Sequence, residues 1–184
     1  MTGVRPARAE DAKTIAGIEM ETWRATYPGM LPDTVLLGMS ERRLAGSWSA
    51  LLRRWPRDVL VAIDPRDGIV GFGHCGPQRG VAIDYAGEIF TLYVAPDQQG
   101  RGVGRRLLLA LFARLHDTGH DSALVWVIRA NPARYFYERL GGRQVAHRPI
   151  PVGGQPVEAV AYGWSDLAKV LAGQTRRITD DPRR

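Results

Sequence analysis

The sequence predicts a mixed α/β fold of the α+β-like kind, in which about four helices flank a central, mostly antiparallel twisted sheet of about seven strands. Two patterns predict it: segments with the two-residue alternation of strands, and segments with the three- and four-residue spacing of amphipathic helices. Their order along the chain, βααβββαβαββ, makes the sheet too antiparallel for a doubly wound fold. We expect one domain over residues 1–168, because 184 residues with 45% hydrophobic content suit a single core. A charged tail over residues 169–184 is expected to be partly disordered.

The first part of the chain predicts one short strand and two helices. Val4–Ala7 has strand character, and Glu10 and Asp11 lie where a helix begins. A second helix is indicated after the bend at residues 27–32, which contains proline and glycine. The core-facing positions of the first helix are Ile15, Ile18 and Thr22, and those of the second are Leu44, Trp48, Leu51, Leu52 and Trp55.

Strands dominate the middle and the end of the chain. Two are expected at residues 59–63 and 69–75, joined by a turn rich in aspartate, and a third at residues 88–94. An amphipathic helix from residue 103, a strand at 123–128 and a short helix that Asn131 caps follow in order. Strands at 143–150 and 157–164 form a final hairpin.

The most informative segment is the turn between the third of these strands and the amphipathic helix. Gly100, Gly102 and Gly104 permit backbone angles that other residues resist, and they let a ligand approach the main chain. The first N–H groups of a helix lack internal partners and carry the positive end of its dipole, so a diphosphate would fit there. The spacing excludes a P-loop, which requires Gly-Lys-Ser/Thr, and a dinucleotide fingerprint, whose third glycine would fall at Arg105.

Two motifs carry a resemblance to a known family. The segment Gln99-Gly-Arg-Gly-Val-Gly104 follows the pattern Q/R-x-x-G-x-G/A, and the segment from Asn131 through Tyr137 to Gly141 resembles N-x-x-A/R-x-x-F-Y-x-x-x-G. On these motifs the chain resembles the GNAT superfamily of acetyl-CoA-dependent N-acetyltransferases, from Val4 to about Trp164. Its asparagine-to-tyrosine spacing is one residue shorter than in some relatives. The order of strands and helices is also that of the GNAT fold, so residues 1–168 would form one GNAT acetyltransferase domain.

The resemblance implies a coenzyme A site, with acetyl-CoA as cosubstrate and no metal. In the family the glycine loop binds the pyrophosphate of coenzyme A, and a bulge splays the preceding strand so that its N–H groups can stabilise an oxyanion. Carried onto this sequence, the cofactor-binding residues are Leu92, Tyr93, Val94, Gln99, Gly100, Arg101, Gly102, Val103, Gly104, Arg105 and Asn131.

Two side chains are candidates for the catalytic chemistry. An alkyl ammonium has a pKa of about 10.4, so a base must deprotonate the acceptor, directly or through water. Glu88 resembles the family position for a catalytic carboxylate, and a surface charge at a strand end is the alternative. Tyr137 is the candidate acid for the leaving thiolate, and a structural tyrosine is the alternative. Relatives that acetylate ribosomal protein N-termini have a glutamate at the position of Trp126, which counts against that substrate here.

Other residues carry weaker predictions. Trp23 and Tyr27 fall in the segment that lines the acceptor side in the family, so we expect either substrate contact or a core role. Cys75 has no partner pattern for covalent catalysis and is expected to be a small buried hydrophobe. The 4 histidines lack metal-ligand spacing, so no metal site is expected.

The resulting hypothesis is an acyltransferase that moves an acetyl group from acetyl-CoA to a primary amine of a small molecule or protein, by direct attack in a ternary complex. A protein N-terminal or lysine acetyltransferase is one alternative. A non-catalytic acyl-CoA-binding module or sensor, which would keep the glycine loop without turnover, is another.

Charge and composition bear on partners and location. The net charge of +6 is inflated by arginines in the tail, and acidic residues are spread along the chain, so no nucleic-acid partner is expected. The sequence shows no signal peptide and no apolar run of ~18 residues, and its lone cysteine cannot form an internal disulfide. We therefore expect a cytoplasmic protein without membrane attachment. The oligomeric state stays open, and a homodimer is compatible with the sequence.

Overall fold

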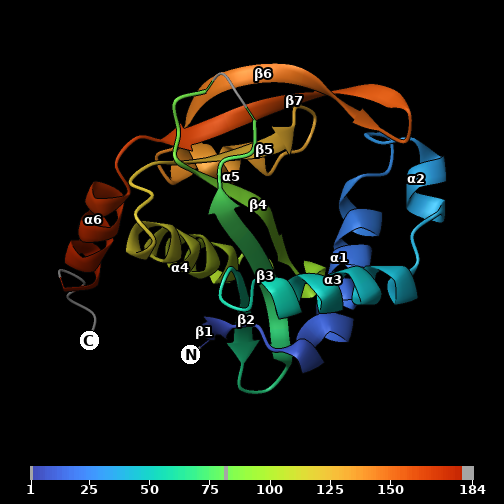
Figure 1. Cartoon of the computed structure of the whole chain (residues 1–184), viewed down its shortest axis with the longest axis horizontal. Helices are drawn as coiled ribbons and strands as arrows, with labels where there is room; N and C mark the ends of the chain where they lie inside the picture. The colour runs from blue at the N-terminus through green and yellow to red at the C-terminus, as the bar shows by residue number, and fades with distance from the viewer. Residues whose placement is uncertain (1, 81–82, 180–184) are drawn as a thin grey trace.

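A seven-stranded twisted sheet forms the centre of the molecule, with the strands in the order β1-β2-β3-β4-β5-β7-β6 (Figure 1). The computed structural model describes residues 2–80 and 83–179, with side chains up to residue 173. Neighbouring strands are antiparallel except β4 and β5, so the predicted mixed α/β fold is confirmed. The strands are β1 (Gly3–Pro6), β2 (Val59–Asp64), β3 (Gly68–Pro77), β4 (Gly87–Val94), β5 (Ala123–Ile128), β6 (Arg143–Val152) and β7 (Gln155–Trp164).

Six α-helices occur in the part of the chain that the structure describes, two more than expected. They are α1 (Ala12–Thr26), α2 (Asp33–Leu37), α3 (Glu41–Arg54), α4 (Val103–Asp117), α5 (Arg134–Arg139) and α6 (Leu167–Thr179). Short 3-10 turns precede α1 (Ala9–Asp11) and follow β4 (Pro96–Gln98). The extra helices are α2, which lies just after the proline bend, and α6.

Helix α6 covers the first part of the segment 169–184, for which partial disorder was expected. Residues 169–179 continue a helix that begins at Leu167, whose side chain is fully buried. Val170 and Leu171 pack against the core next to α4 because they recur at helical spacing. The remaining tail, residues 180–184, lies outside the described residues, and the domain boundary at residue 168 stays a prediction.

The two faces of the sheet are covered by different helices. Helix α4 lies on one face, where its buried side chains form the larger core, and α1 and α3 lie on the other (Figure 1). The α4 side chains in that core are Val103, Leu107, Leu108, Leu111, Phe112 and Leu115, which match the predicted apolar stripe. Burial on both faces fixes the central strands and therefore the site between them.

Strands β4 and β5 run parallel only at their beginnings. Their pairing extends from Gly87 opposite Ala123 to Ile89 opposite Val125, and beyond that point the strands separate. At the same point β4 bulges: on β3, Cys75 pairs with Ile89 and His74 pairs with Thr91. Phe90 is therefore an extra residue in β4. The family resemblance implied such a bulge, and the structure places it two residues before Leu92.

The β6–β7 hairpin arches over one end of the sheet and reaches α2 (Figure 1). Its two-residue turn consists of Gly153 and Gly154, both with positive φ, as a tight hairpin of this kind requires. The tip packs closely: a Cβ at Gly153 would lie 2.4 Å from Val35 of α2. Segments that are distant in sequence are thus joined across the open end of the sheet.

Candidate active site

A cavity of about 830 Å³ lies where β4 and β5 separate. Its walls come from α1 and the following loop, both diverging strands, the glycine loop, α5 and the tip of the β6–β7 hairpin. A volume of this size is typical of sites for small organic ligands. The cavity is lined by Thr22, Trp23, Ala25, Thr26, Tyr27, Leu31, Phe90, Thr91, Leu92, Tyr93, Val94, Gln99, Gly100, Gly102, Gly104, Arg105, Val125, Trp126, Val127, Ile128, Asn131, Pro132, Ala133, Phe136, Tyr137, Arg139, Leu140, Ile150 and Val152.

The glycine loop enters α4 through a left-handed residue. Gly102 caps the helix at φ 77°, and Gly100 has φ 75°, so both positions need glycine for their backbone conformation. A side chain of α4 holds the loop, since Arg106 Nη2 donates a hydrogen bond to the carbonyl of Arg101 at 3.1 Å. This contact lies at the entry of α4, where the first N–H groups of a helix lack intrahelical acceptors.

Not every residue predicted in this loop turns its side chain to the cavity. Arg101 points the other way, since its Nη1 donates to Oε1 of Gln98 at 3.2 Å. Val103 is buried in the α4 core. For these two residues only the backbone is available to a ligand, whereas Gln99 and Arg105 line the cavity.

The end of β4 presents main-chain groups to the gap between the strands. Ala95 N donates to the carbonyl of Val70 on β3 at 2.9 Å. In an antiparallel ladder, the N–H groups of successive residues point alternately toward and away from the neighbouring strand. The Ala95 N–H points toward β3, so the N–H groups of Leu92 and Val94 point away from β3. They face the space where β5 has separated from β4. The Val94 carbonyl is already occupied, because it accepts a hydrogen bond from Gln99 Nε2 at 3.1 Å.

Asn131 connects the entry of α5 to the acceptor side of the cavity. Its Oδ1 accepts from the Ala133 N–H at 2.8 Å, and its Nδ2 donates to the Tyr27 hydroxyl at 3.4 Å. Regular helix begins at Arg134 with Ala133 at its N-cap, so Asn131 caps the tighter turn that precedes α5 and not, as expected, the helix itself. Asn131 is buried, so this bridge fixes one corner of the cavity.

Tyr137 lines the cavity from α5 and is buried. Its ring packs against Phe136, with centroids 5.2 Å apart, and against Trp164, with centroids 6.2 Å apart. Burial and the neighbouring Tyr27 raise the pKa of the Tyr137 hydroxyl, so the phenol keeps its proton at neutral pH. A protonated hydroxyl at the cavity wall can donate a proton or a hydrogen bond.

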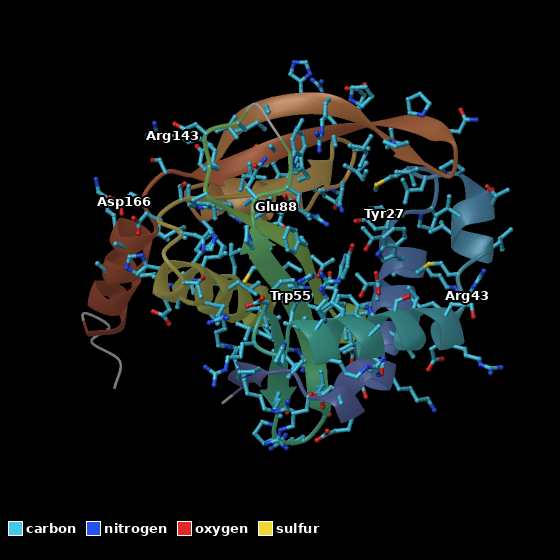
Figure 2. All side chains as sticks on the ribbon, in the orientation of Figure 1. Tyr27, Arg43, Trp55, Glu88, Arg143 and Asp166 are labelled. Carbon is cyan, nitrogen blue, oxygen red and sulfur yellow. The ribbon has the colours of Figure 1, made fainter. Side chains whose placement is uncertain are left out.

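Glu88 lies outside the cavity wall, at the beginning of β4 (Figure 2). It is buried, and its two carboxylate oxygens accept hydrogen bonds from the backbone N–H and the guanidinium of Arg79. Figure 2 shows Glu88 well separated from Tyr27 at the end of α1. Glu88 is thus not among the residues that line the cavity together with Tyr137 and the glycine loop, and any action on a bound amine would have to pass through water.

A buried polar cluster that the sequence did not indicate lies behind the α1 wall. Trp48 Nε1 donates to Oε2 of Glu19 at 2.6 Å, and burial raises the pKa of that carboxyl. Burial also raises the pKa of Tyr93, whose hydroxyl interacts with that of Tyr27. Trp23 and Tyr27 stand at this wall with ring centroids 5.1 Å apart. Both predicted acceptor-side residues thus line the cavity and also pack in the fold.

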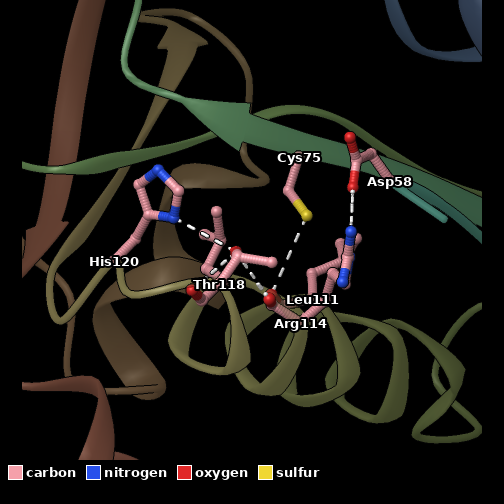
Figure 3. A network of polar contacts seen from close by, with 7 residues as sticks. Asp58, Cys75, Leu111, Arg114, Thr118 and His120 are labelled. Carbon is pink, nitrogen blue, oxygen red and sulfur yellow. Dashed lines mark hydrogen bonds and ion pairs between the residues drawn. The ribbon is translucent and has the colours of Figure 1, made fainter. Parts of the chain in front are cut away.

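Cys75 lies in a separate network on the α4 face (Figure 3). Its Sγ lies 3.8 Å from the carbonyl of Leu111, and burial raises the pKa of the thiol to about 12. Beside it, Arg114 pairs with Asp58 at 2.8 Å. Such a thiol is not a nucleophile at neutral pH, as the sequence suggested. Among the described residues, no group of three or more His, Cys, Asp or Glu side chains could hold a metal ion.

Comparisons with known proteins agree with this architecture. The sequence model of the FR47-like protein family matches residues 79–149. The N-acetyltransferase YuaI of Bacillus subtilis is 33% identical over 91% of this chain and 95% of its own length. The mycothiol acetyltransferase of Salinispora arenicola is 32% identical over 68% of this chain, which spans only 46% of that relative.

Solved structures show the same fold at low sequence identity. An acetyltransferase of the GNAT family from Desulfovibrio desulfuricans superposes with a TM-score of 0.68 at 19% identity, covering 91% of this chain and 100% of that one. The structure of yncA from Salmonella typhimurium with its cofactor acetyl-CoA gives 0.64 at 22% identity, covering 91% and 94%. Fold and relatives together define an acyltransferase. The chain belongs to the GNAT superfamily of N-acetyltransferases.

No helix in the described residues combines the length and apolar character needed to cross a membrane. The location of the protein in the cell stays a prediction.

Proposed function

We propose that this N-acetyltransferase moves an acetyl group from acetyl-CoA to a primary amine of a small molecule, by direct attack in a ternary complex. One observation carries the proposal: the glycine loop, the freed N–H groups of β4 and the protonated Tyr137 all border the same 830 Å³ cavity. Acyl transfer needs an anion site, oxyanion donors and a proton source within reach of one another.

The cosubstrate fits the loop side of the cavity. The N–H groups at the beginning of α4 would bind the pyrophosphate, with Gln99 and Arg105 beside it. The N–H groups of Leu92 and Val94 would bind the chain that leads to the thioester and stabilise the oxyanion. Asn131 would hold the turn that faces that chain. Two solved structures of the same fold, yncA with acetyl-CoA and the PaiA N-acetyltransferase of Thermoplasma acidophilum with coenzyme A, support this choice of cosubstrate.

The reaction requires that protons leave the amine, that a proton reaches the sulfur, and that the carbon–sulfur electron pair moves to the sulfur. The amine nitrogen attacks the thioester carbonyl once it has lost its extra proton, and Glu88 is our candidate to take that proton through water. As the tetrahedral intermediate collapses, the carbon–sulfur bond breaks and the sulfur leaves with the electron pair. Tyr137 gives its proton to that sulfur. The nitrogen, which is positively charged after the attack, loses a second proton through solvent to leave the amide; this proton restores the phenol, and the proton taken by Glu88 is released to solvent.

A small acceptor is favoured over a protein end by the way the cavity is bounded. The tip of the β6–β7 hairpin packs on α2 at Gly153 and Val35, so an extended peptide would meet a bridge across the acceptor side. The apolar cluster behind this bridge includes Leu31, Ile150 and Val152. A small molecule needs no open groove.

Turnover with a panel of amines tests the proposal. The purified full chain is incubated with acetyl-CoA and single amines, thiol release is followed, and the acetylated product is weighed by mass spectrometry. Thiol release that depends on an amine, with a matching product, is expected. Acetyl-CoA binding without turnover on any small amine or peptide would instead identify a non-catalytic acyl-CoA-binding module.

A further inference from the structure

The acceptor side of the cavity is walled mainly by apolar side chains. Four aromatic side chains from three different elements face it: Trp23, Tyr27, Phe90 and Trp126. Aliphatic side chains close the remaining side, namely Leu31, Ile150 and Val152. Walls of this kind stabilise a ligand by removing its apolar surface from water.

The charged side chains that line this cavity are all positive. Among the described residues, none of those that line it is an aspartate or a glutamate. The charged residues in the lining are Arg105 and Arg139. Glu19 and Glu88 lie behind the walls, and each is engaged by a neighbouring side chain. A cation placed deep in this space would lose its hydration without gaining a carboxylate partner.

Two of the four aromatic rings compensate little for that loss, because arginines of this chain already stack on them. The guanidinium of Arg79 lies 3.8 Å from the centroid of Phe90, and that of Arg148 lies 4.3 Å from the centroid of Trp126. A ring attracts a cation through the negative charge of its face. With a guanidinium on one face, Phe90 and Trp126 offer a second cation only an electrostatically weakened ring.

We propose that the acceptor is a small amine whose remainder is an aromatic or aliphatic hydrocarbon group, and that a second cationic group on the acceptor is selected against. This inference rests on the proposed function and names the substrate class of the same site. The hydrocarbon group would occupy the space between Trp23, Phe90 and Trp126, while the reacting nitrogen points toward Tyr137. Polyamines and lysine side chains within basic peptides are thereby disfavoured.

A matched pair of amines tests the charge rule. Hexylamine and cadaverine have the same number of heavy atoms, and they differ in whether the far end is a methyl or an ammonium group. We expect kcat/KM with acetyl-CoA to be higher for hexylamine by on the order of 100-fold, and phenethylamine to be at least as good as hexylamine. Equal values for the pair, or a preference for cadaverine, would overturn the inference.

A charge introduced at the rim should reverse part of the preference. Val152 lines the cavity and is half-buried on the hairpin, so Val152→Glu adds a carboxylate without filling the core. The ratio of kcat/KM for cadaverine to that for hexylamine is expected to rise about tenfold in this variant. Val152→Gln is the matched control, with the same size and no charge, and its ratio should stay near the wild-type value. An equal rise in both variants would show that the charge is not responsible.

Binding separates this inference from the proposed function. Calorimetry with the full chain saturated with coenzyme A measures whether hexylamine and phenethylamine bind while cadaverine does not. If they bind selectively but no amine is acetylated, the proposed function fails and the ligand class stands. If acetylation occurs and cadaverine binds as well as hexylamine, the function stands and the ligand class is wrong.

Discussion

Both carboxylate oxygens of Glu88 accept hydrogen bonds from Arg79, whose backbone N–H and guanidinium donate at 2.9 and 3.0 Å. The same guanidinium stacks on Phe90, and Phe90 lines the cavity. The Phe90 ring therefore contacts the Arg79–Glu88 ion pair through Arg79 and also lines the acceptor side of the cavity. If Glu88 acts as a base, it needs a water molecule beside Phe90 to reach the amine. Its catalytic role and its structural role with Arg79 can be tested separately.

Replacing Glu88 with glutamine removes the charge and keeps an oxygen that can accept from the Arg79 N–H. If Glu88 takes the proton of the amine through water, turnover should fall by on the order of 10²–10⁴-fold while acetyl-CoA affinity holds. Steady-state kinetics, with acetyl-CoA affinity from calorimetry, measure both effects.

The control for this change is Glu10→Gln, because Glu10 is an exposed carboxylate that pairs only loosely with Arg8 at 3.8 Å. Its turnover should match that of the wild type. Unaltered turnover in Glu88→Gln as well would make Glu88 a structural partner of Arg79 and assign the proton to solvent.

Gly104 offers a cleaner test of the coenzyme A loop than its neighbour Gly102. A Cβ at Gly104 would lie 3.4 Å from Phe136 and 3.7 Å from Val94, which is ordinary contact, so the larger valine side chain must extend into the cavity or displace these walls. We expect Gly104→Val to weaken acetyl-CoA binding by more than about tenfold and Gly104→Ala to weaken it much less. Calorimetry on both variants measures the difference.

Side chains at Gly102 would not isolate the same effect. Its φ of 77° is left-handed, so any substitution strains the backbone by about 1–2 kcal/mol before a ligand is considered. Wild-type acetyl-CoA affinity in a folded Gly104→Val variant would remove the loop from the proposed site.

His74 should make the protein less stable in mild acid. Burial lowers the pKa of His74 to about 4, against an ordinary value of 6.5, although Asp58 opposes this shift and Arg79 supports it. Between these two values the unfolded chain binds a proton that the folded chain resists, so the free energy of unfolding falls as the pH is lowered from 6.5 to 4. The full loss is about 3 kcal/mol.

His74→Phe should flatten this dependence, because the ring can keep its contacts with Phe90 and Trp48 without titrating. Urea unfolding at several pH values measures the slope. His147→Phe is the matched control at an exposed position and should keep the wild-type slope. A slope that survives in His74→Phe would mean that other groups cause the acid sensitivity.

The fold was largely predictable because buried faces repeat in the sequence. Leu107, Leu108 and Leu111 are fully buried, and their spacing forms the apolar face that predicted α4. Helix α2 was missed because it has only 5 residues, of which Leu36 alone is buried. Helix α6 was missed because its apolar residues lie at its beginning, next to a charged segment that dominates the composition.

The site was predictable only where local motifs define it. The glycine loop, Asn131 and Tyr137 are fixed by spacing along the chain, and all three border the cavity. Trp126 and Val152 reach the cavity through the path of β5 and of the hairpin, which no local period encodes. The pairing of Glu88 with Arg79 depends in the same way on how the chain returns from β3 to β4.

The last prediction concerns the Tyr137 hydroxyl, for which a packing role and a catalytic role differ in one atom. Tyr137→Phe keeps the ring contacts with Phe136 and Trp164, and none of the hydrogen bonds found among the described residues involves this hydroxyl. Stability should therefore change by less than about 1 kcal/mol. The phenol holds its proton at neutral pH, and burial raises its pKa further, so a proton is present for the leaving sulfur. Turnover should fall while acetyl-CoA affinity holds.

An activated thioester separates acid catalysis from any other loss of activity in this variant. A thioester whose thiol is more acidic needs less help to leave, so the loss in Tyr137→Phe should shrink with it if the hydroxyl protonates the sulfur. Tyr135→Phe, which removes an exposed hydroxyl from the same helix, is the matched control and should leave both rates unchanged. An equal loss with acetyl-CoA and with the activated thioester would argue that Tyr137 positions the substrate rather than protonating it, and no loss with either would make Tyr137 a residue of the core.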